Sequence, residues 1–173
     1  TREDMAAFCG LASEHGIQVV THAIGDEAIS RVLDAYEAVM PAGQRNPLRH
    51  ALIHCQITDR ALCRRIAELG VLVMAQPVFL DADRELAEKL CGRALAESSY
   101  AFGSMLRAGV HLSYGTDCPV ETCAPLWNLG AAVTRCGPDG GTAFVPSERV
   151  DVETAVDAYT MESADAEVQE HCK

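Results

Sequence analysis

Short apolar segments alternate with longer amphipathic segments along most of the chain, and this alternation limits the possible folds more than any other feature. Apolar runs with the β-branched content of strands occupy residues 17–20, 48–55, 71–75 and 110–114. The run 71–75 is apolar throughout, which is typical of a strand buried on both faces of a parallel sheet. Helices are predicted at 4–15, 27–40, 58–69, 102–108 and 126–135, and a last one from Asp151. Strands joined by such helices predict βαβ units, and therefore an α/β fold with a parallel sheet.

The number of predicted units limits the architecture further. A closed eight-stranded barrel takes about 250 residues, and this chain has 173. The open alternatives are a small doubly wound sheet and half of a barrel. The segment 78–99 is less regular than the rest, and it predicts a helix or lid over the strand ends.

Charge and composition exclude several kinds of partner. The formal net charge is −11, and no basic run is longer than the pair Arg64-Arg65, so a surface for nucleic acid or for an anionic membrane is not expected. No apolar run approaches the roughly 20 residues that span a bilayer. The eight cysteines lie within periodic segments and form no Cys-x-x-Cys pair, which favours reduced thiols in a cytoplasmic protein over a disulfide framework.

Metal-binding side chains follow three of the four predicted strands. His22 follows the first, His54 ends the second and Asp117 follows the fourth, whereas the third strand ends at Gln76. Functional groups of parallel α/β folds lie at the carboxyl ends of the strands. Imidazole nitrogens and carboxylate oxygens are the ligands that a hydrolytic Zn²⁺, Fe²⁺ or Mn²⁺ uses. The spacing alone leaves two interpretations open, a metal site at the strand ends or a chance set of polar residues.

The residues around these positions resemble a known family. The segments Thr21 to Asp26, Arg49 to Gln56, Met74 to Pro77 and Tyr114 to Val120 are similar to successive motifs of the amidohydrolase superfamily. The resemblance is strongest to amidohydrolase family 3, the branch that includes N-substituted formamide deformylases. It continues through residues 125–135 and 152–160, in order along nearly the whole chain.

This resemblance implies a fold and a set of roles. Residues 1–173 would form a single unit, the second half of a TIM barrel, with the predicted strands in the places of strands five to eight. His22 and His54 would bind a divalent metal, with zinc expected and iron or manganese as the alternatives. Asp117 would bind the metal, take a proton from the attacking water and pass it to the leaving nitrogen. The implied reaction is hydrolysis of a C–N bond in a small amide, formamide or cyclic amide.

The resemblance also implies ligands that this chain does not contain. Members of the family draw a His-x-His pair from the first strand and a lysine or acidic bridging ligand from the fourth, and the sequence has no His-x-His. We therefore expect these ligands to precede Thr1 in a longer protein. The chain alone is expected to be inactive, with an incomplete metal site, and to lack the small β-sandwich that relatives build from both termini.

Three more residues are candidates for contacts with substrate or with the metal ligands. They are Asp26, Gln76 and Tyr100. Asp26 also suits a cap for the helix that follows it, and this is the favoured interpretation of that residue.

Three residues beside the candidate ligands are expected to be structural. His50 lies at the amino end of its strand, away from the predicted site. Cys55 and Cys118 directly follow candidate ligands, and adjacent strand side chains point to opposite faces, so both thiols are expected to pack against helices.

A function of a different class stays open: a non-catalytic α/β binding or interaction module in which the histidines and Asp117 are incidental. A His-x-His after a strand in the residues upstream of Thr1 would favour the enzyme. Half a barrel has two open sheet edges with apolar flanks. Unless the missing amino-terminal half covers these edges, the chain is expected to self-associate through them.

Overall fold

The strands form one four-stranded sheet in the computed structural model, which describes residues 1–40 and 44–172. The strand order is β1-β2-β3-β4, and each neighbouring pair is parallel. The strands are β1 (Val20–Ala23), β2 (Ala51–His54), β3 (Leu72–Ala75) and β4 (Leu112–Tyr114). The predicted α/β fold with a parallel sheet is confirmed.

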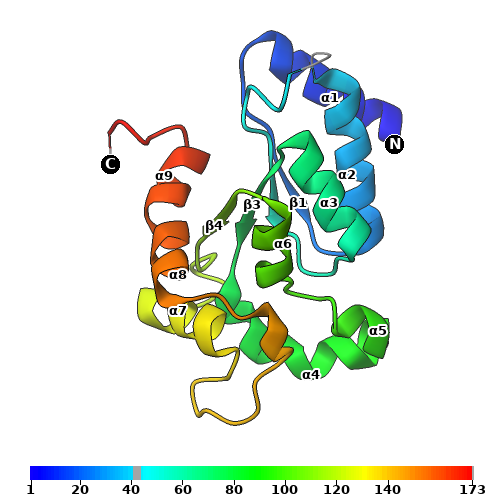
Figure 1. Cartoon of the computed structure of the whole chain (residues 1–173). Helices are drawn as coiled ribbons and strands as arrows, with labels where there is room; N and C mark the ends of the chain where they lie inside the picture. Colours follow the sequence, from blue (N-terminus) through cyan, green and yellow to red (C-terminus); the bar gives the residue numbers. More distant parts are fainter. Residues whose placement is uncertain (41–43, 173) are drawn as a thin grey trace.

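Helices connect the strands and extend beyond the sheet. They are α1 (Arg2–Glu14), α2 (Asp26–Val39), α3 (Arg60–Leu69), α4 (Leu80–Cys91), α5 (Arg93–Ala96), α6 (Phe102–Ala108), α7 (Pro125–Thr134), α8 (Val152–Tyr159) and α9 (Met161–Ala166), with short 3₁₀ helices η1 (Pro77–Phe79) and η2 (Pro146–Glu148). Helices α2, α3 and α6 lie together on one side of the sheet, with α1 against α2 (Figure 1). On the other side, α8 and α9 lie beside β4, while α4, α5 and α7 lie across the carboxyl ends of the strands (Figure 1). The irregular segment 78–99 is therefore mostly helical, at the predicted place.

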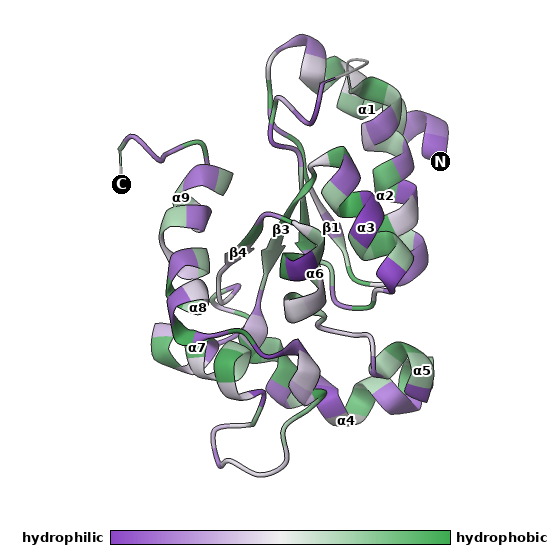
Figure 2. Ribbon diagram, viewed as in Figure 1, coloured by the Kyte–Doolittle hydropathy of each residue, from purple (hydrophilic) through white to green (hydrophobic). Residues whose placement is uncertain are grey.

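The main core lies between the sheet and the helices that cover it. Its members include Leu52, Val73 and Leu112, which are at most 2% exposed. These three residues are aligned across β2, β3 and β4 by the register of the sheet, so their side chains share one face. Figure 2 shows the apolar strands between helices that carry many hydrophilic residues.

Local signals set the ends of several helices. Asp59 caps α3, and its Oδ1 accepts a hydrogen bond from the backbone N–H of Leu62 at 2.7 Å. Gly70 ends α3 with a φ of 68°, and Gly109 ends α6 with a φ of 84°, a conformation that glycine adopts without the steric cost of a Cβ. In each case the next strand begins a few residues later, as the sequence predicts.

The first strand is displaced from its predicted position. The apolar run 17–20 predicts the strand, but β1 covers Val20–Ala23 and shares only Val20 with that run. Hydrogen bonding to the neighbouring strand sets its bounds, since Val20 to Ala23 lie opposite Ala51 to His54. His22 is therefore a residue of the strand itself and does not follow it.

The structure places one of the two thiols beside the candidate ligands as predicted and the other differently. All eight are free thiols. Cys55 is 1% exposed and part of the core, as expected, whereas Cys118 is exposed. The strand ends at Tyr114, so strand alternation no longer governs the direction of Cys118. None of the helices in residues 1–40 and 44–172 has the length and apolar character needed to cross a membrane.

Candidate metal centre

Two of the predicted ligands meet at the carboxyl ends of β1 and β2. The rings of His22 and His54 have centroids 4.6 Å apart and planes inclined by 79°. His22 is exposed, and His54 is 8% exposed. The pairing of these strands places Ala23 opposite His54, so the two histidines are neighbours because the strands are hydrogen-bonded and parallel.

The backbone turns sharply at the candidate residues. His54, Cys55 and Asp117 have φ angles of 75°, 51° and 58°, in the left-handed region that residues other than glycine seldom adopt. Such backbone conformations cluster at functional sites, where the surrounding structure holds them in place. At β2 the turn directs the chain away from the sheet immediately after the histidine.

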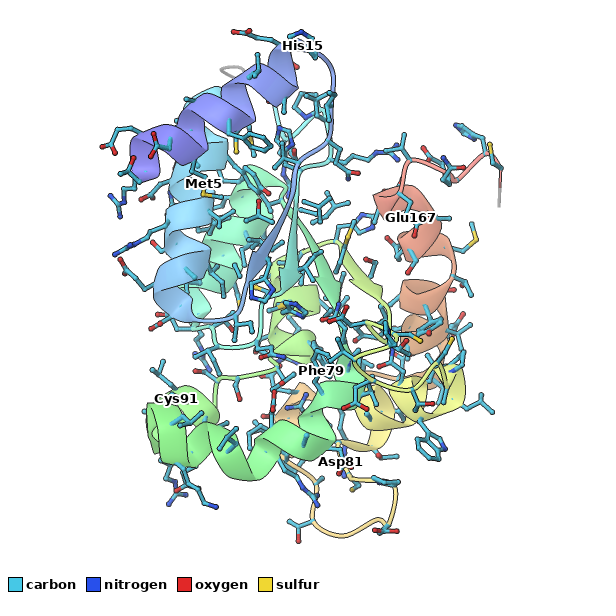
Figure 3. The ribbon with its side chains drawn as sticks, turned by 180° about the vertical axis from the view of Figure 1, so that it is seen from behind. Met5, His15, Phe79, Asp81, Cys91 and Glu167 are labelled. Carbon is cyan, nitrogen blue, oxygen red and sulfur yellow. The ribbon has the colours of Figure 1, made fainter. Side chains whose placement is uncertain are left out.

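Two residues of the turn after β3 hold the His54 ring. Nδ1 of His54 lies 2.8 Å from Oε1 of Gln76. The ring of Phe79 stacks on His54 with a centroid distance of 5.9 Å and an interplanar angle of 28°. Phe79 lies at the end of the sheet that faces α4 (Figure 3). Gln76 therefore contacts a candidate ligand, whereas the sequence pattern gave no role to Phe79.

Asp117 is not brought together with the two histidines. It is exposed and follows β4, which β3 separates from β2. Within the part of the chain that the structure describes, no group of three or more His, Cys, Asp or Glu side chains is arranged to hold a metal ion. This chain alone therefore presents a pair of imidazoles and a separate carboxylate, all at the carboxyl ends of the strands.

The two other candidates have partners within the protein. Asp26 is the first residue of α2, and Gly25 is the N-cap; Oδ1 of Asp26 accepts a bond from the backbone N–H of Glu27 at 2.9 Å. Tyr100 is 2% exposed, and its hydroxyl donates to Asp83 on α4. Burial raises the pKa of Tyr100, and the bond to Asp83 raises it further. Asp26 thus binds the first turn of its helix without capping it, and Tyr100 attaches α4 to the segment before α6.

Besides Phe79, a second residue that supports the site was missed from the sequence. Asn128 of α7 is fully buried; its Oδ1 accepts from the backbone N–H of Val78 at 2.8 Å, and its Nδ2 donates to the carbonyl of Gly115 at 2.9 Å. It therefore joins the turn that holds His54 to the segment that leads to Asp117. A single polar residue within the apolar run 126–133 was the available signal for this role.

The chain is similar in sequence to proteins of one family. Residues 1–173 match the amidohydrolase family model. The chain is 34% identical over 171 residues to Protein LONG AFTER FAR-RED 3 of Arabidopsis thaliana, covering 98% of this chain and 29% of that protein. It is 32% identical over 156 residues to the N-substituted formamide deformylase of Arthrobacter pascens, covering 90% of this chain and 28% of that enzyme.

A solved structure agrees in fold. An uncharacterized metal-dependent hydrolase from Pyrococcus furiosus superposes with a TM-score of 0.83 and 28% identity, covering 98% of this chain and 33% of that one. The chain thus spans about a third of the length of the proteins it matches. Because the family model matches from the first residue to the last, the chain belongs to the amidohydrolase family.

Proposed function

We propose that this chain is the carboxyl-terminal half of the barrel of a metal-dependent hydrolase that cleaves C–N bonds in small amides, formamides or cyclic amides. The observation that carries the proposal is the pair of imidazoles, His22 and His54, 4.6 Å apart at the ends of adjacent parallel strands. Family membership and the similarity to the N-substituted formamide deformylase of Arthrobacter pascens support the C–N bond as the target. The strands β1 to β4 would then be strands five to eight of the whole barrel.

The side chains present suit a divalent cation. Two imidazoles and a carboxylate are donors that Zn²⁺, Fe²⁺ and Mn²⁺ accept, and zinc is the ion we expect. His22, His54 and Asp117 would hold the cation, and the missing amino-terminal half would supply the other ligands. With only part of this set, the chain alone is expected to be inactive.

The chemistry divides between the cation and Asp117. A divalent cation, when bound, supplies Lewis-acid polarisation of water and of the scissile carbonyl. The Asp117 carboxylate accepts a proton from water as the water oxygen bonds to the carbonyl carbon, and donates that proton to the nitrogen as the C–N bond breaks. The products are a carboxylic acid and an amine. The carboxylate of Asp117 is exposed, so it can reach both water and substrate.

Alanine variants of the full-length protein test this assignment. His22→Ala and His54→Ala should each lose bound metal and lower kcat/KM by more than about 100-fold, the upper end of the effect of losing an outer hydrogen-bond partner. Asp117→Asn should lower kcat by about 10²–10⁴, the usual contribution of a general base. His15→Ala is the control, because this exposed histidine ends α1 at the opposite end of the sheet.

Metal content by elemental analysis and hydrolysis of an N-substituted formamide are the two measurements. Unchanged metal content and activity in all three variants would overturn the proposal. A protein that binds no metal and hydrolyses none of the three classes of amide would favour the non-catalytic module.

The open edges of the sheet give a further expectation for the isolated chain. β1 and β4 are the edge strands, and Val20 of β1 is 37% exposed. Unpaired strand edges with apolar flanks associate, so the isolated chain should form dimers or larger species in sedimentation velocity. Val20→Lys should shift it towards monomer, whereas Leu90→Lys on α4, at a position 75% exposed, should not. A stable wild-type monomer would contradict this expectation.

A further inference from the structure

We propose that Gln76 fixes the tautomer of His54, so that the Nδ1 atom carries the proton and the Nε2 atom keeps its lone pair for a cation. Only the part that assigns the Nε2 lone pair to a cation rests on the proposed function. The tautomer itself follows from hydrogen bonds of the described side chains and holds with or without a metal.

The orientation of the Gln76 amide is set by the backbone of β3. Its Nε2 donates to the carbonyl oxygen of Met74 at 3.1 Å. A carbonyl oxygen can only accept, so the amide nitrogen has to face Met74 and the amide oxygen has to face the opposite way. Gln76 is 7% exposed, and reversing the amide would set two oxygens against each other in a buried place at the cost of a lost hydrogen bond.

The amide oxygen then determines the proton position on the imidazole. Oε1 of Gln76 lies 2.8 Å from Nδ1 of His54. An amide oxygen cannot donate, so this contact is a hydrogen bond only when Nδ1 carries the proton. In a neutral imidazole the other nitrogen, Nε2, is then the acceptor and the metal-binding atom.

The same turn fixes the direction of the ring. Gln76 directly precedes η1, and Phe79 is the last residue of η1. The turn therefore supplies both the hydrogen bond to Nδ1 and the Phe79 ring, whose centroid lies 5.9 Å from that of His54. On another side, the ring of His22 meets His54 nearly edge to face. Gln76 is accordingly a positioning residue that acts through His54.

The chain contains an internal reference of the opposite tautomer. At the other end of β2, Nδ1 of His50 accepts a bond from the backbone N–H of Val19 at 3.0 Å. A backbone N–H can only donate, so neutral His50 carries its proton on Nε2, which lies 3.2 Å from Oγ of Ser13. The two histidines of one strand are thus predicted to show opposite tautomers.

Nitrogen NMR of the histidine rings tests the assignment directly. We would label the rings of the full-length, metal-free protein with ¹⁵N and record two-bond proton–nitrogen correlations at a pH where the rings are neutral. The expected pattern is Nδ1–H for His54 and Nε2–H for His50. Finding Nε2–H at His54 in the wild-type protein would overturn the proposal, and this measurement requires no variant to fold.

Two variants of similar size separate this role from packing. Gln76→Met keeps the length of the side chain and removes the acceptor, whereas Gln76→Glu keeps an oxygen facing Nδ1. Gln76→Met should lose the Nδ1–H signature and weaken binding of Zn²⁺ alone, measured by chelator competition, by about 10–100-fold. Gln76→Glu should retain the Nδ1–H signature and the affinity, at lower stability, because its second oxygen faces the Met74 carbonyl that the amide nitrogen binds in the wild type. If Gln76→Met keeps the wild-type tautomer and affinity, the glutamine only fills space and the proposal fails.

The readouts also distinguish this proposal from the proposed function. Wild-type protein with the Nδ1–H tautomer but no affinity for Zn²⁺, Fe²⁺ or Mn²⁺ would sustain the assignment to Gln76 and contradict the metal centre. Metal binding by a protein in which His54 is the Nε2–H tautomer would support the metal centre and contradict the assignment to Gln76.

Discussion

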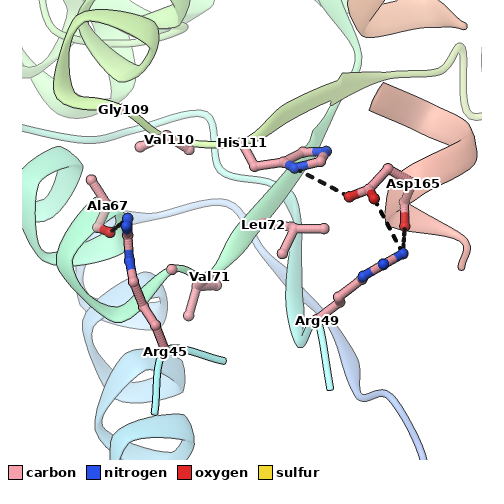
Figure 4. A pocket seen from close by; sticks show the side chains of 10 residues that line it. Arg45, Arg49, Ala67, Val71, Leu72, Gly109, Val110, His111 and Asp165 are labelled. Atoms are coloured by element: carbon pink, nitrogen blue, oxygen red, sulfur yellow. Dashed lines mark hydrogen bonds and ion pairs between the residues drawn. The ribbon is translucent and has the colours of Figure 1, made fainter. Parts of the chain in front are cut away.

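At the amino ends of the strands, polar side chains form hydrogen bonds and ion pairs with other residues of the protein. At the carboxyl ends, His22 and Asp117 are exposed. Arg49, just before β2, binds both carboxylate oxygens of Glu170 at 2.6 and 2.9 Å and the carbonyl of Asp165 at 2.7 Å. Asp165 also contacts His111, before β4, at 3.4 Å (Figure 4). Arg49, His111 and Asp165 line a cavity of about 280 Å³, and all three already have charged partners within the protein.

The difference is sharpest for two histidines four residues apart. His50 uses both ring nitrogens within the protein and stacks on Tyr36 at 5.1 Å. Burial lowers the pKa of His50 and so favours the neutral ring. His54 binds Gln76 through Nδ1 and meets a second histidine instead of a tyrosine. One strand thus carries a structural histidine at one end and a candidate ligand at the other.

The largest expected effect on stability separates these two histidines. His50→Ala leaves the buried N–H of Val19 without its acceptor and opens a space beside Tyr36, so it should lower the free energy of unfolding by about 3 kcal/mol. His54→Ala removes one hydrogen bond between side chains and the ring contacts with Phe79 and His22, leaves no backbone group without a partner, and should cost about 1–2 kcal/mol in metal-free protein. Urea denaturation measures both values. The comparison fails if His54→Ala is the more destabilising change.

Two buried asparagines offer a matched pair for the two ends of the sheet. Asn46 donates to the carbonyls of His50 and Gly70, both at 2.8 Å, and accepts from the N–H of His50 at 2.7 Å. Asn128 bonds the backbone at Val78 and Gly115. Replacing either by alanine leaves buried backbone groups unsatisfied, which should cost about 2–3 kcal/mol.

Metal affinity should distinguish the asparagine variants. Asn128→Ala loosens the turn that holds His54 and should weaken Zn²⁺ binding about 10-fold, as loss of outer support does at metal sites. Asn46→Ala should leave the affinity unchanged, although it removes three hydrogen bonds and places alanine at a φ of 43°, so its loss of stability should be at least as large. Equal weakening of Zn²⁺ binding in both variants would show that affinity follows general stability and not the end of the sheet.

Sequence alternation predicted the sheet because apolar content and helix signals such as Gly70 and Gly109 are local. It misplaced β1, because pairing with β2 recruits the polar residues Thr21 and His22. The helical period from Asp151 also predicts one apolar face with Val152, Ala155, Val156 and Tyr159. Ala155 is buried as expected, but Val152 and Val156 are 64% and 41% exposed. The buried face of α8 consists of the smaller Ala155 and Ala158, since packing against close neighbours selects small side chains.

The candidate site also has features that the sequence predicts and features that it does not. That His22 and His54 are neighbours follows from strand order alone, since the carboxyl ends of adjacent parallel strands lie side by side. The position of Asp117 depends on the curvature of the sheet between β2 and β4, which no local pattern encodes. Contacts made by Phe79 and Asn128 depend on turn geometry after β3, and the sequence could indicate only that a proline starts this turn.

The smallest expected effect concerns the charges at the amino ends. Hydrogen bonds from Arg49 lower the pKa of Glu170 to about 2, against about 4.3 for an unperturbed glutamate. The unfolded chain therefore binds this proton more readily than the folded protein does. The stabilisation from the pair is present above about pH 4.3 and is lost as the pH falls towards 2.

Glu170→Gln should therefore lower the free energy of unfolding at pH 7 and have little effect near pH 2. Arg49→Gln should raise the pKa of the Glu170 carboxyl towards that of an unperturbed glutamate. Carbon NMR of the carboxyl groups and urea midpoints at both pH values measure these changes. Glu97→Gln is a control, because Glu97 pairs with Arg93 at 2.7 Å on α5, away from the strands. A wild-type Glu170 that titrates near pH 4.3 would mean that the pair is open in solution. The amino ends would then hold free charges, as the carboxyl ends do, and the contrast between the two ends would rest on the histidines alone.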